Sequence, residues 1–219
     1  ATFSKFLIDQ GECRGVKLQD GTEIFANAGV VSSLDPYQTY LHGFEDGVLP
    51  ESFLSMVRNF SFGDVTIARV HYALNEAPRF KNGSDMDKTA FQRMFGTLSD
   101  IDKQYNEISS GIAPSDPFLW TAAWTTMDPT RAPEGKHTLI MDTFVPVDLA
   151  NGDNWEELAP SYIREKLLGQ LRNYTTNMDD ENILAEYIET GPSLERANRC
   201  FYRGVTTGGE RTLAQMGVF

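Results

Sequence analysis

The three histidines are the first candidates for chemistry, because an imidazole can bind a metal ion or act as a general base. His42, His71 and His137 are scattered over separate predicted elements. A metal site needs two or three convergent ligands at short spacings, and Cys13 and Cys200 supply no such spacing either. The sequence therefore predicts no metal site and no disulfide framework.

Nucleophilic and acid–base catalysis find little more support. A nucleophilic serine needs a strained turn of the Gly-x-Ser-x-Gly type, which the chain does not contain, although a triad assembled in space from distant residues stays open. Acidic clusters stand at predicted helix starts or in loops, where carboxylates favour the positive end of the helix dipole, so we interpret them as solvated caps. These clusters are Asp100/Asp102, Glu156/Glu157 and residues 179–181. We assign no catalytic residue.

The glycine-rich loop at residues 204–209 is a candidate for binding a phosphate through its backbone. It lacks both the Gly-x-Gly-x-x-Gly of dinucleotide-binding turns and the Lys-Ser/Thr of a P-loop. On its own, this loop does not predict a nucleotide site.

Aromatic residues are more suggestive, since 14 Phe, 8 Tyr and 3 Trp make up 11% of the chain. Trp120 and Trp124 lie four residues apart on a strand predicted over 118–126, and this spacing places both rings on one face of a sheet. That face could pack on the long helix predicted over 155–174, or it could line a cleft for an apolar ligand. Both interpretations predict a sheet face that is rich in large rings.

The elements that must position these residues form an α+β pattern. Asp20-Gly21 is a hairpin signal between two alternating segments, so a β-meander opens the chain. The apolar run at 28–33 predicts a strand buried on both faces. The other predicted strands are 3–8, 15–18, 22–26, 65–74, 91–97, 118–126, 137–145 and 183–188. Helices are predicted to begin near Asp35, Pro50, Ser99 or Asp100, Asp153 and Ser193. We expect a mixed or antiparallel sheet with helices mainly on one face, preceded by the β-meander.

Length and charge set limits on partners and location. The 219 residues are 41% hydrophobic and 23% charged with a mean hydropathy of -0.35, which is typical of one or two globular domains. The formal net charge of -12 repels a phosphate backbone and argues against a nucleic-acid partner. No apolar run reaches the length of a membrane span and no basic-then-apolar leader precedes the first strand, so the sequence predicts a cytoplasmic protein.

Four segments, at both ends and in the middle of the chain, carry a resemblance to a known family. Residues 15–26 (GVKLQDGTEIFA) and 30–36 (VVSSLDP) are similar to a hairpin and a following strand of phytoene-desaturase-like flavoproteins. That family also includes carotenoid ketolases and retinol-saturase-like enzymes. Residues 128–137 (DPTRAPEGKH) and 208–216 (GGERTLAQM) resemble a later turn and a late glycine-rich segment of the same family.

The resemblance implies a division of the chain. Residues 1–34 would be a remnant of the FAD-binding domain, 35–205 the substrate-binding domain, and 206–219 a segment that returns towards the FAD domain. The Gly-x-Gly-x-x-Gly turn with which such enzymes hold the FAD pyrophosphate is absent, so the chain resembles the excised middle of a larger flavoprotein. We therefore expect FAD in the full-length parent and no cofactor in this fragment alone.

Candidate site residues follow from the same resemblance. In the parent, backbone near two short segments would approach the cofactor, and large rings would enclose the substrate. The implied cofactor contacts are Ser32, Ser33, Gly208 and Gly209, and the implied substrate contacts are Phe118, Trp120 and Trp124. The chain departs from the family's pattern at Glu210-Arg211, where a histidine is common.

The resemblance implies a function for the chain as part of a larger enzyme. It would be the substrate-binding portion of a FAD-dependent oxidoreductase of the phytoene dehydrogenase or carotenoid ketolase kind, inactive alone. The substrate would be an apolar small molecule or lipid, such as an isoprenoid, and the parent would contact membranes peripherally. The reaction type and the oligomeric state are left open. One alternative is a standalone module that binds an apolar ligand without flavin, and another is a hydrolase with a triad assembled in space.

Overall fold

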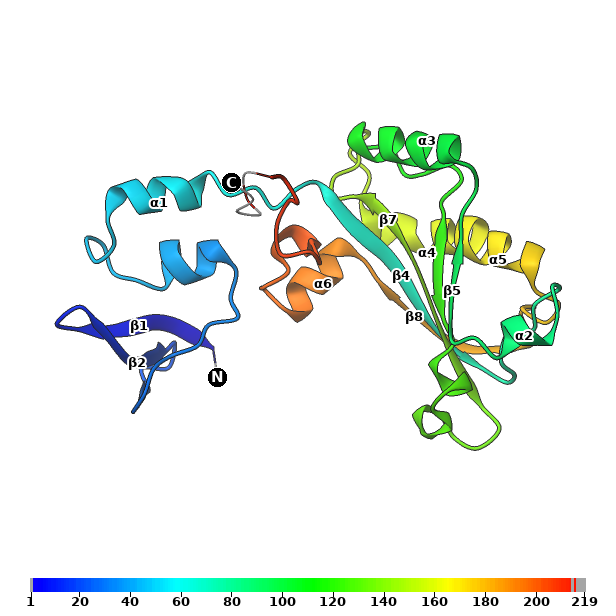
Figure 1. Cartoon of the computed structure of the whole chain (residues 1–219), viewed down its shortest axis with the longest axis horizontal. Helices are drawn as coiled ribbons and strands as arrows, with labels where there is room; N and C mark the ends of the chain where they lie inside the picture. The colour runs from blue at the N-terminus through cyan, green and yellow to red at the C-terminus, as the bar shows by residue number, and fades with distance from the viewer. Residues whose placement is uncertain (1, 214, 216–219) are drawn as a thin grey trace. The chain divides into compact units, whose positions relative to one another are not determined.

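The computed structural model describes residues 2–213 and 215. Backbone contacts divide the chain into two compact units (Figure 1). The meander unit comprises Ala1–Gly63, Asn198–Tyr202 and Thr207–Phe219, and the sheet unit comprises Asp64–Ala197 and Arg203–Thr206. In the short 3-10 turn η5 (Tyr202–Gly204), the first residue belongs to the meander unit and the other two belong to the sheet unit. The division of the parent's domains near residues 34 and 205 stays a prediction.

The meander unit contains an antiparallel sheet of order β1-β2-β3, with β1 (Phe3–Asp9), β2 (Glu12–Leu18) and β3 (Glu23–Phe25). The predicted Asp-Gly turn is confirmed, because Gly21 has φ +88° and the Asp20 carboxylate accepts a 2.9 Å hydrogen bond from the Thr22 backbone N–H. Gly15 is required on β2, since a Cβ at this position would collide with the carbonyl oxygen of Ile24. The β-meander expected from the sequence is thus present.

Two helices complete the meander unit, the π-helix η1 (Tyr37–His42) and α1 (Glu51–Arg58). The Tyr37 hydroxyl lies 3.1 Å from the carbonyl oxygen of Arg58 and 3.2 Å from that of Phe60, and links the two helical segments. The strand predicted over 28–33 does not form, and Val31 is 98% exposed. That prediction was wrong because an apolar run becomes a strand only beside a partner, and the three described strands of this sheet pair among themselves.

The sheet unit is organised by a five-stranded antiparallel sheet of order β5-β6-β7-β4-β8. Its centre is the pair of β4 (Val65–Leu74) and β7 (His137–Pro146), which are hydrogen-bonded in unbroken register over their full length. The remaining strands are β5 (Phe91–Met94), β6 (Leu119–Ala122) and β8 (Ile183–Glu189). The sequence predicted strands at 65–74 and 137–145 from their β-branched residues, and these two strands form the central pair of the sheet.

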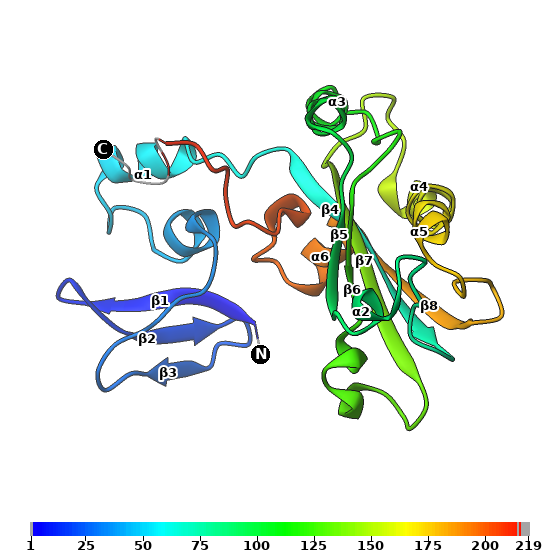
Figure 2. The same ribbon diagram turned by 45° about the vertical axis from the view of Figure 1, so that its right-hand side comes forward.

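Helices cover mainly one face of this sheet, and the core lies between them. Figure 2 shows α4 (Trp155–Tyr162) and α5 (Gly169–Tyr174) on one side of the strands, joined by the π-helix η4 (Ile163–Leu168). The buried cluster takes alternate residues of the central strands together with the apolar stripe of these helices. Its fully buried members include Val70, Tyr72, Leu74, Leu119, Leu139, Met141, Ile163, Leu167, Leu168 and Leu171. The expected α+β architecture is confirmed.

The remaining helices of the sheet unit are α2 (Ser84–Asp87), α3 (Leu98–Ser109), α6 (Gly191–Ala197) and the 3-10 turns η2 (Trp124–Thr126) and η3 (Pro129–Arg131). Thr97 caps α3 in a capping box in which Asp100 is the third helical residue, so the cap is neither Ser99 nor Asp100 as predicted. Asn154, not the predicted Asp153, caps α4 by accepting a 2.8 Å hydrogen bond from the Glu156 N–H. None of the described helices combines the length and the apolar character that a membrane crossing requires.

One predicted strand is shorter in the structure, and this changes the position of a candidate residue. The segment 118–126 was expected to be one strand, but β6 ends at Ala122 and η2 begins at Trp124. The reason is that the partner strand β5 begins at Phe91, opposite Ala122, so the ladder has almost no further residues to pair beyond that point. Trp120 and Trp124 therefore do not share a strand.

Candidate functional site

The face of the five-stranded sheet opposite α4 and α5 carries one row of residues that crosses all five strands. Arg93 on β5 is opposite Trp120 on β6, which is opposite Asp142 on β7. Asp142 is opposite Arg69 on β4, and Arg69 is opposite Glu189 on β8. Residues that are directly opposite in a ladder share a face and touch. This row and its neighbours on the same face are called the aromatic face below.

A continuous band of rings runs along one side of the aromatic face. Its ring centroids are separated by 5.5 Å between Phe95 and Phe118, 6.4 Å between Phe118 and Phe144, and 5.3 Å between Phe144 and Trp120. Phe91 continues the band 6.3 Å from Trp120 in an edge-to-face arrangement. Such ring pairs add attraction beyond the burial of their area. The band offers a half-buried apolar surface that the helices of the core do not use.

The part of the row on β7, β4 and β8 consists of charged residues. The Arg69 guanidinium donates to the Asp142 carboxylate from Nε at 3.0 Å and Nη2 at 2.7 Å. A second carboxylate, that of Glu189, lies 3.7 Å from Arg69 Nη1 and 2.8 Å from His71 Nε2. The side chain of Asp142 is 13% exposed and that of Glu189 is 22% exposed, so these ions are partly desolvated and hold one another in place. They pair with one another across β7, β4 and β8.

Arg93 differs from the other charged residues of the row. Its guanidinium carbon lies 4.4 Å from the centroid of the Trp120 ring and 5.2 Å from that of Phe91. Among the described residues, no carboxylate comes within ion-pair distance of it. The cation therefore lies on ring faces, and the residue is exposed to solvent.

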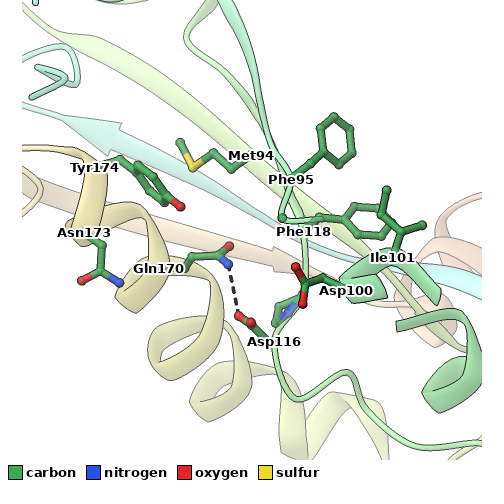
Figure 3. A pocket seen from close by; sticks show the side chains of 11 residues that line it. Met94, Phe95, Asp100, Ile101, Asp116, Phe118, Gln170, Asn173 and Tyr174 are labelled. Carbon is green, nitrogen blue, oxygen red and sulfur yellow. Dashed lines mark hydrogen bonds between the residues drawn. The ribbon is translucent and has the colours of Figure 1, made fainter. Parts of the chain in front are cut away.

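A cavity of about 240 Å³ lies where the band of rings meets the loop before α3 (Figure 3). Phe95 and Phe118 line it together with Gln170 and Asp116, and Gln170 Nε2 donates to the Asp116 carboxylate at 3.3 Å. Asp100 also lines it, and the hydrogen bonds that this carboxylate accepts from the backbone and the hydroxyl of Thr97 lower its pKa. The band thus ends at a cavity that combines rings with carboxylates.

The structure brings two of the three predicted substrate contacts together. Phe118 and Trp120 both contact Phe144 and belong to the band. The premise that Trp124 shares their strand was wrong, because it opens η2, where its ring lies 5.9 Å from the Arg131 guanidinium. The interpretation that the paired tryptophans pack on the long helix was also wrong for Trp120, since that helix packs on the opposite face. A substrate-binding role for all three residues stays a prediction.

The four predicted cofactor contacts belong to the meander unit and have contacts within the protein. The Ser32 hydroxyl lies 3.2 Å from that of Thr39 and accepts a hydrogen bond from the Leu34 N–H. A Cβ on Gly209 would collide with the Phe60 ring, so packing alone explains that glycine. Ser33 is exposed, and Gly208 adopts φ +72° with open space around it. The contacts of Ser32 and Gly209 are thus explained within the protein, and the cofactor-binding roles of all four residues stay predictions. Ala214 and Met216 of the late segment lie outside the described residues.

Metal and acid–base sites gain no support from the described part of the chain. No group of three or more His, Cys, Asp or Glu side chains that could hold a metal ion occurs among the described residues. The predicted acidic caps carry ion pairs or cap bonds: a hydrogen bond from Arg172 lowers the pKa of Asp180, and one from Arg196 lowers that of Glu156. These carboxyls are held ionised, which suits structural pairing rather than proton transfer.

Comparison with known proteins gives distant relatives in one broad class. No family model matches the chain. Over 199 residues it is 24% identical to the mouse pyridine nucleotide-disulfide oxidoreductase domain-containing protein 2, an alignment that covers 87% of this chain and 34% of the mouse protein. The rat protein of the same name is 24% identical over 196 residues, covering 85% of this chain and 33% of that protein. The chain therefore spans about a third of the length of these curated relatives.

Solved structures show the same fold. An oxidoreductase from Methanosarcina mazei superposes with a TM-score of 0.50 at 16% identity over 85% of this chain and 36% of that one. A reduced UDP-galactopyranose mutase superposes with a TM-score of 0.50 at 9% identity over 94% of this chain and 44% of that one. The chain is thus distantly related to pyridine nucleotide-disulfide oxidoreductase domain-containing proteins, and its fold is similar to part of the Methanosarcina mazei oxidoreductase and of UDP-galactopyranose mutase.

Proposed function

We propose that the chain is the substrate-binding part of a larger FAD-dependent oxidoreductase, and that the aromatic face is the surface against which the substrate lies. The observation that carries this proposal is the band of rings from Phe95 to Phe91 on a sheet face that the core helices leave uncovered. A large apolar surface rimmed by charged groups is typical of a ligand site. The oxidoreductase relatives, which are longer than this chain, support the same assignment.

The proposal extends to a substrate class and to a family. Residues 15–26, 30–36 and 128–137 resemble phytoene-desaturase-like flavoproteins, which supports an apolar substrate such as an isoprenoid or another lipid. A parent of this kind would meet its substrate at a membrane surface. Exposed apolar residues of the meander unit, Phe25 at 69% and Val31 at 98%, support a further part of the parent that covers them.

The residues of this chain would bind and orient rather than transfer protons. When bound in the parent, FAD would supply the redox chemistry. The rings of Phe118, Trp120 and Phe144 would exclude water from the reacting part of the substrate and fix the plane in which it lies. The Arg69–Asp142 pair would hold the strands in register under the substrate.

The binding half of the proposal is tested on this chain with dodecan-1-ol as an apolar probe and isothermal titration calorimetry as the readout. We expect Trp120→Ala to weaken binding about tenfold, because the band loses its central ring. Tyr105→Ala is the matched control, since Tyr105 is an exposed ring on α3 that is 58% exposed. Trp124→Ala decides whether the third predicted contact belongs to the site. Equal effects of Trp120→Ala and Tyr105→Ala, or no binding at all, would overturn the proposal.

The flavin half is tested by absorbance in the flavin bands after incubation with excess FAD and desalting. We expect the chain alone to retain no flavin and a longer gene product that includes a dinucleotide-binding turn to retain it stoichiometrically. Stoichiometric flavin on this chain alone would show that its cofactor contacts suffice, and no flavin on the longer product would favour the standalone lipid-binding alternative.

A further inference from the structure

We propose that the ligand of the aromatic face is an apolar molecule that carries a carboxylate, and that Arg93 is the residue that selects it. This inference rests on the proposed function, because it assigns a chemical class to the molecule that the face binds. Its starting point is the charge pattern of the cross-strand row. The row contains two arginines, and their surroundings differ.

The first arginine is neutralised within the protein. Arg69 makes two hydrogen bonds to Asp142 and has Glu189 as a second acid at 3.7 Å. Arg69 is therefore engaged by two carboxylates, and Glu189 has His71 as a further partner at 2.8 Å. This half of the row offers no unpaired cation to a ligand.

Arg93, the second arginine, keeps an uncompensated charge in the described structure. It is exposed, it lies over two rings, and the described carboxylates leave it without an ion pair. β5 is an edge strand of the sheet, so a ligand can reach Arg93 from the open side. In a chain with a net charge of -12, such a cation is the natural partner of an anion brought by a ligand.

Trp120, whose ring lies under the Arg93 guanidinium, supplies a second donor. Its indole N–H is buried and has no hydrogen-bond partner among the described residues. An indole nitrogen can only donate, and a guanidinium has five donors and no acceptor. The two groups together match a carboxylate, whose two oxygens only accept and which arginine binds in a planar fork. The adjoining band of rings matches the apolar remainder of the same molecule.

The chain contains a matched control for this arrangement. Arg131 also lies near a tryptophan ring, 5.9 Å from the centroid of Trp124, but its Nε is paired with the Asp128 carboxylate at 3.3 Å. Arg131→Gln therefore removes an arginine near a tryptophan without removing an unpaired cation. A general loss of positive charge would affect Arg93→Gln and Arg131→Gln alike.

The experiment compares dodecanoate with dodecan-1-ol on the whole chain by isothermal titration calorimetry at pH 8, below the concentration at which either aggregates. We expect dodecanoate to bind about tenfold more tightly than the alcohol, the size expected of one charge-assisted contact at an exposed site. Arg93→Gln should abolish this preference, so that the acid and the alcohol bind with equal affinity. Arg131→Gln should preserve the preference.

A second readout follows the indole itself. The 15N-labelled chain has three indole N–H resonances, and Trp120→Phe identifies that of Trp120. Dodecanoate should shift this resonance more than the alcohol does, because a hydrogen bond to the carboxylate changes its environment.

The outcomes separate this inference from the proposed function. Equal affinities for the acid and the alcohol, or a preference for the acid that survives Arg93→Gln, would overturn the carboxylate inference while the aromatic face still binds apolar molecules. In that case Arg93 would be a charge that protects an edge strand from pairing with other chains. Failure of both probes to bind would instead refute the proposed function.

Discussion

The two faces of the five-stranded sheet are made by the same strands but have opposite characters. On β7, Leu139 and Met141 point into the core under α4 and α5 and are almost fully buried, whereas Ile140 and Phe144 alternate to the aromatic face and are half-buried. The first face is apolar and closely packed, and the second combines rings with a row of charges. The difference indicates that the first face stabilises the fold, while the second carries groups that packing alone does not require.

The largest expected effect tests that division by truncating neighbouring residues of one strand. Leu139→Ala should lower the free energy of unfolding by about 3 kcal/mol, because it leaves a cavity in a core that cannot collapse. Ile140→Ala should cost about 1 kcal/mol, because its side chain is half exposed and water fills the space. Urea denaturation of both variants measures the two values. Equal losses would show that the aromatic face is as much a part of the core as the other.

The charged row provides the next test. Asp142→Asn should lower the free energy of unfolding by about 2 kcal/mol, since it removes the charge that accepts two hydrogen bonds from Arg69 and leaves Glu189 as the nearest acid. Glu51→Gln is the control, because its pair with Arg58 lies on the surface of α1 and should contribute nothing measurable. Thermal denaturation of the two variants compares them. A negligible change in the free energy of unfolding on Asp142→Asn would mean that the charged residues of the row do not stabilise the fold.

The face of the sheet under α4 and α5, called the covered face below, contains Tyr72, whose burial should make the free energy of unfolding depend on pH in alkali. Burial raises the pKa of Tyr72 to about 12 from its ordinary value of 10.0. Between pH 10 and 12 the unfolded chain releases this proton while the folded chain keeps it, so the free energy of unfolding falls as pH rises. The loss should approach about 1.4 kcal/mol per pH unit at most. Denaturation at several alkaline pH values should show a shallower slope for Tyr72→Phe, and identical slopes would refute the assignment.

Sequence reasoning located the framework of both faces more reliably than the contents of the site. The β-branched residues of segments 65–74 and 137–145 predicted the central strands, and Asp20-Gly21 predicted the hairpin. Both signals depend only on residues within the segment itself. Predicting the site residues required the pairing register between strands. Trp120 faces Asp142 and Arg93 only because three strands align, and no local pattern contains that alignment.

Some of the missed residues did leave a signal in the sequence. Arg69 and Asp142 are opposite charges in the middle of two strands that are otherwise apolar, and a charge in such a place usually has a partner. Pairing the two strands as an antiparallel ladder would have placed these residues together. The position of Trp124 could not be found in this way, because the end of β6 depends on where its partner β5 begins.

The smallest expected effect concerns two tyrosines of the core, Tyr72 on β4 and Tyr162 on α4, which differ in one hydrogen bond. The Tyr162 hydroxyl donates to the Pro114 carbonyl oxygen at 3.0 Å, whereas the Tyr72 hydroxyl is buried without a partner among the described residues. Tyr162→Phe should therefore lower the free energy of unfolding by about 1 kcal/mol, and Tyr72→Phe should leave it unchanged or raise it slightly. Each substitution removes the same oxygen from a buried ring, so differences in volume cancel when the two variants are compared by urea denaturation at pH 7. A loss in Tyr72→Phe as large as that in Tyr162→Phe would show that Tyr72 has a partner, such as a buried water, and that the covered face also contains a polar site.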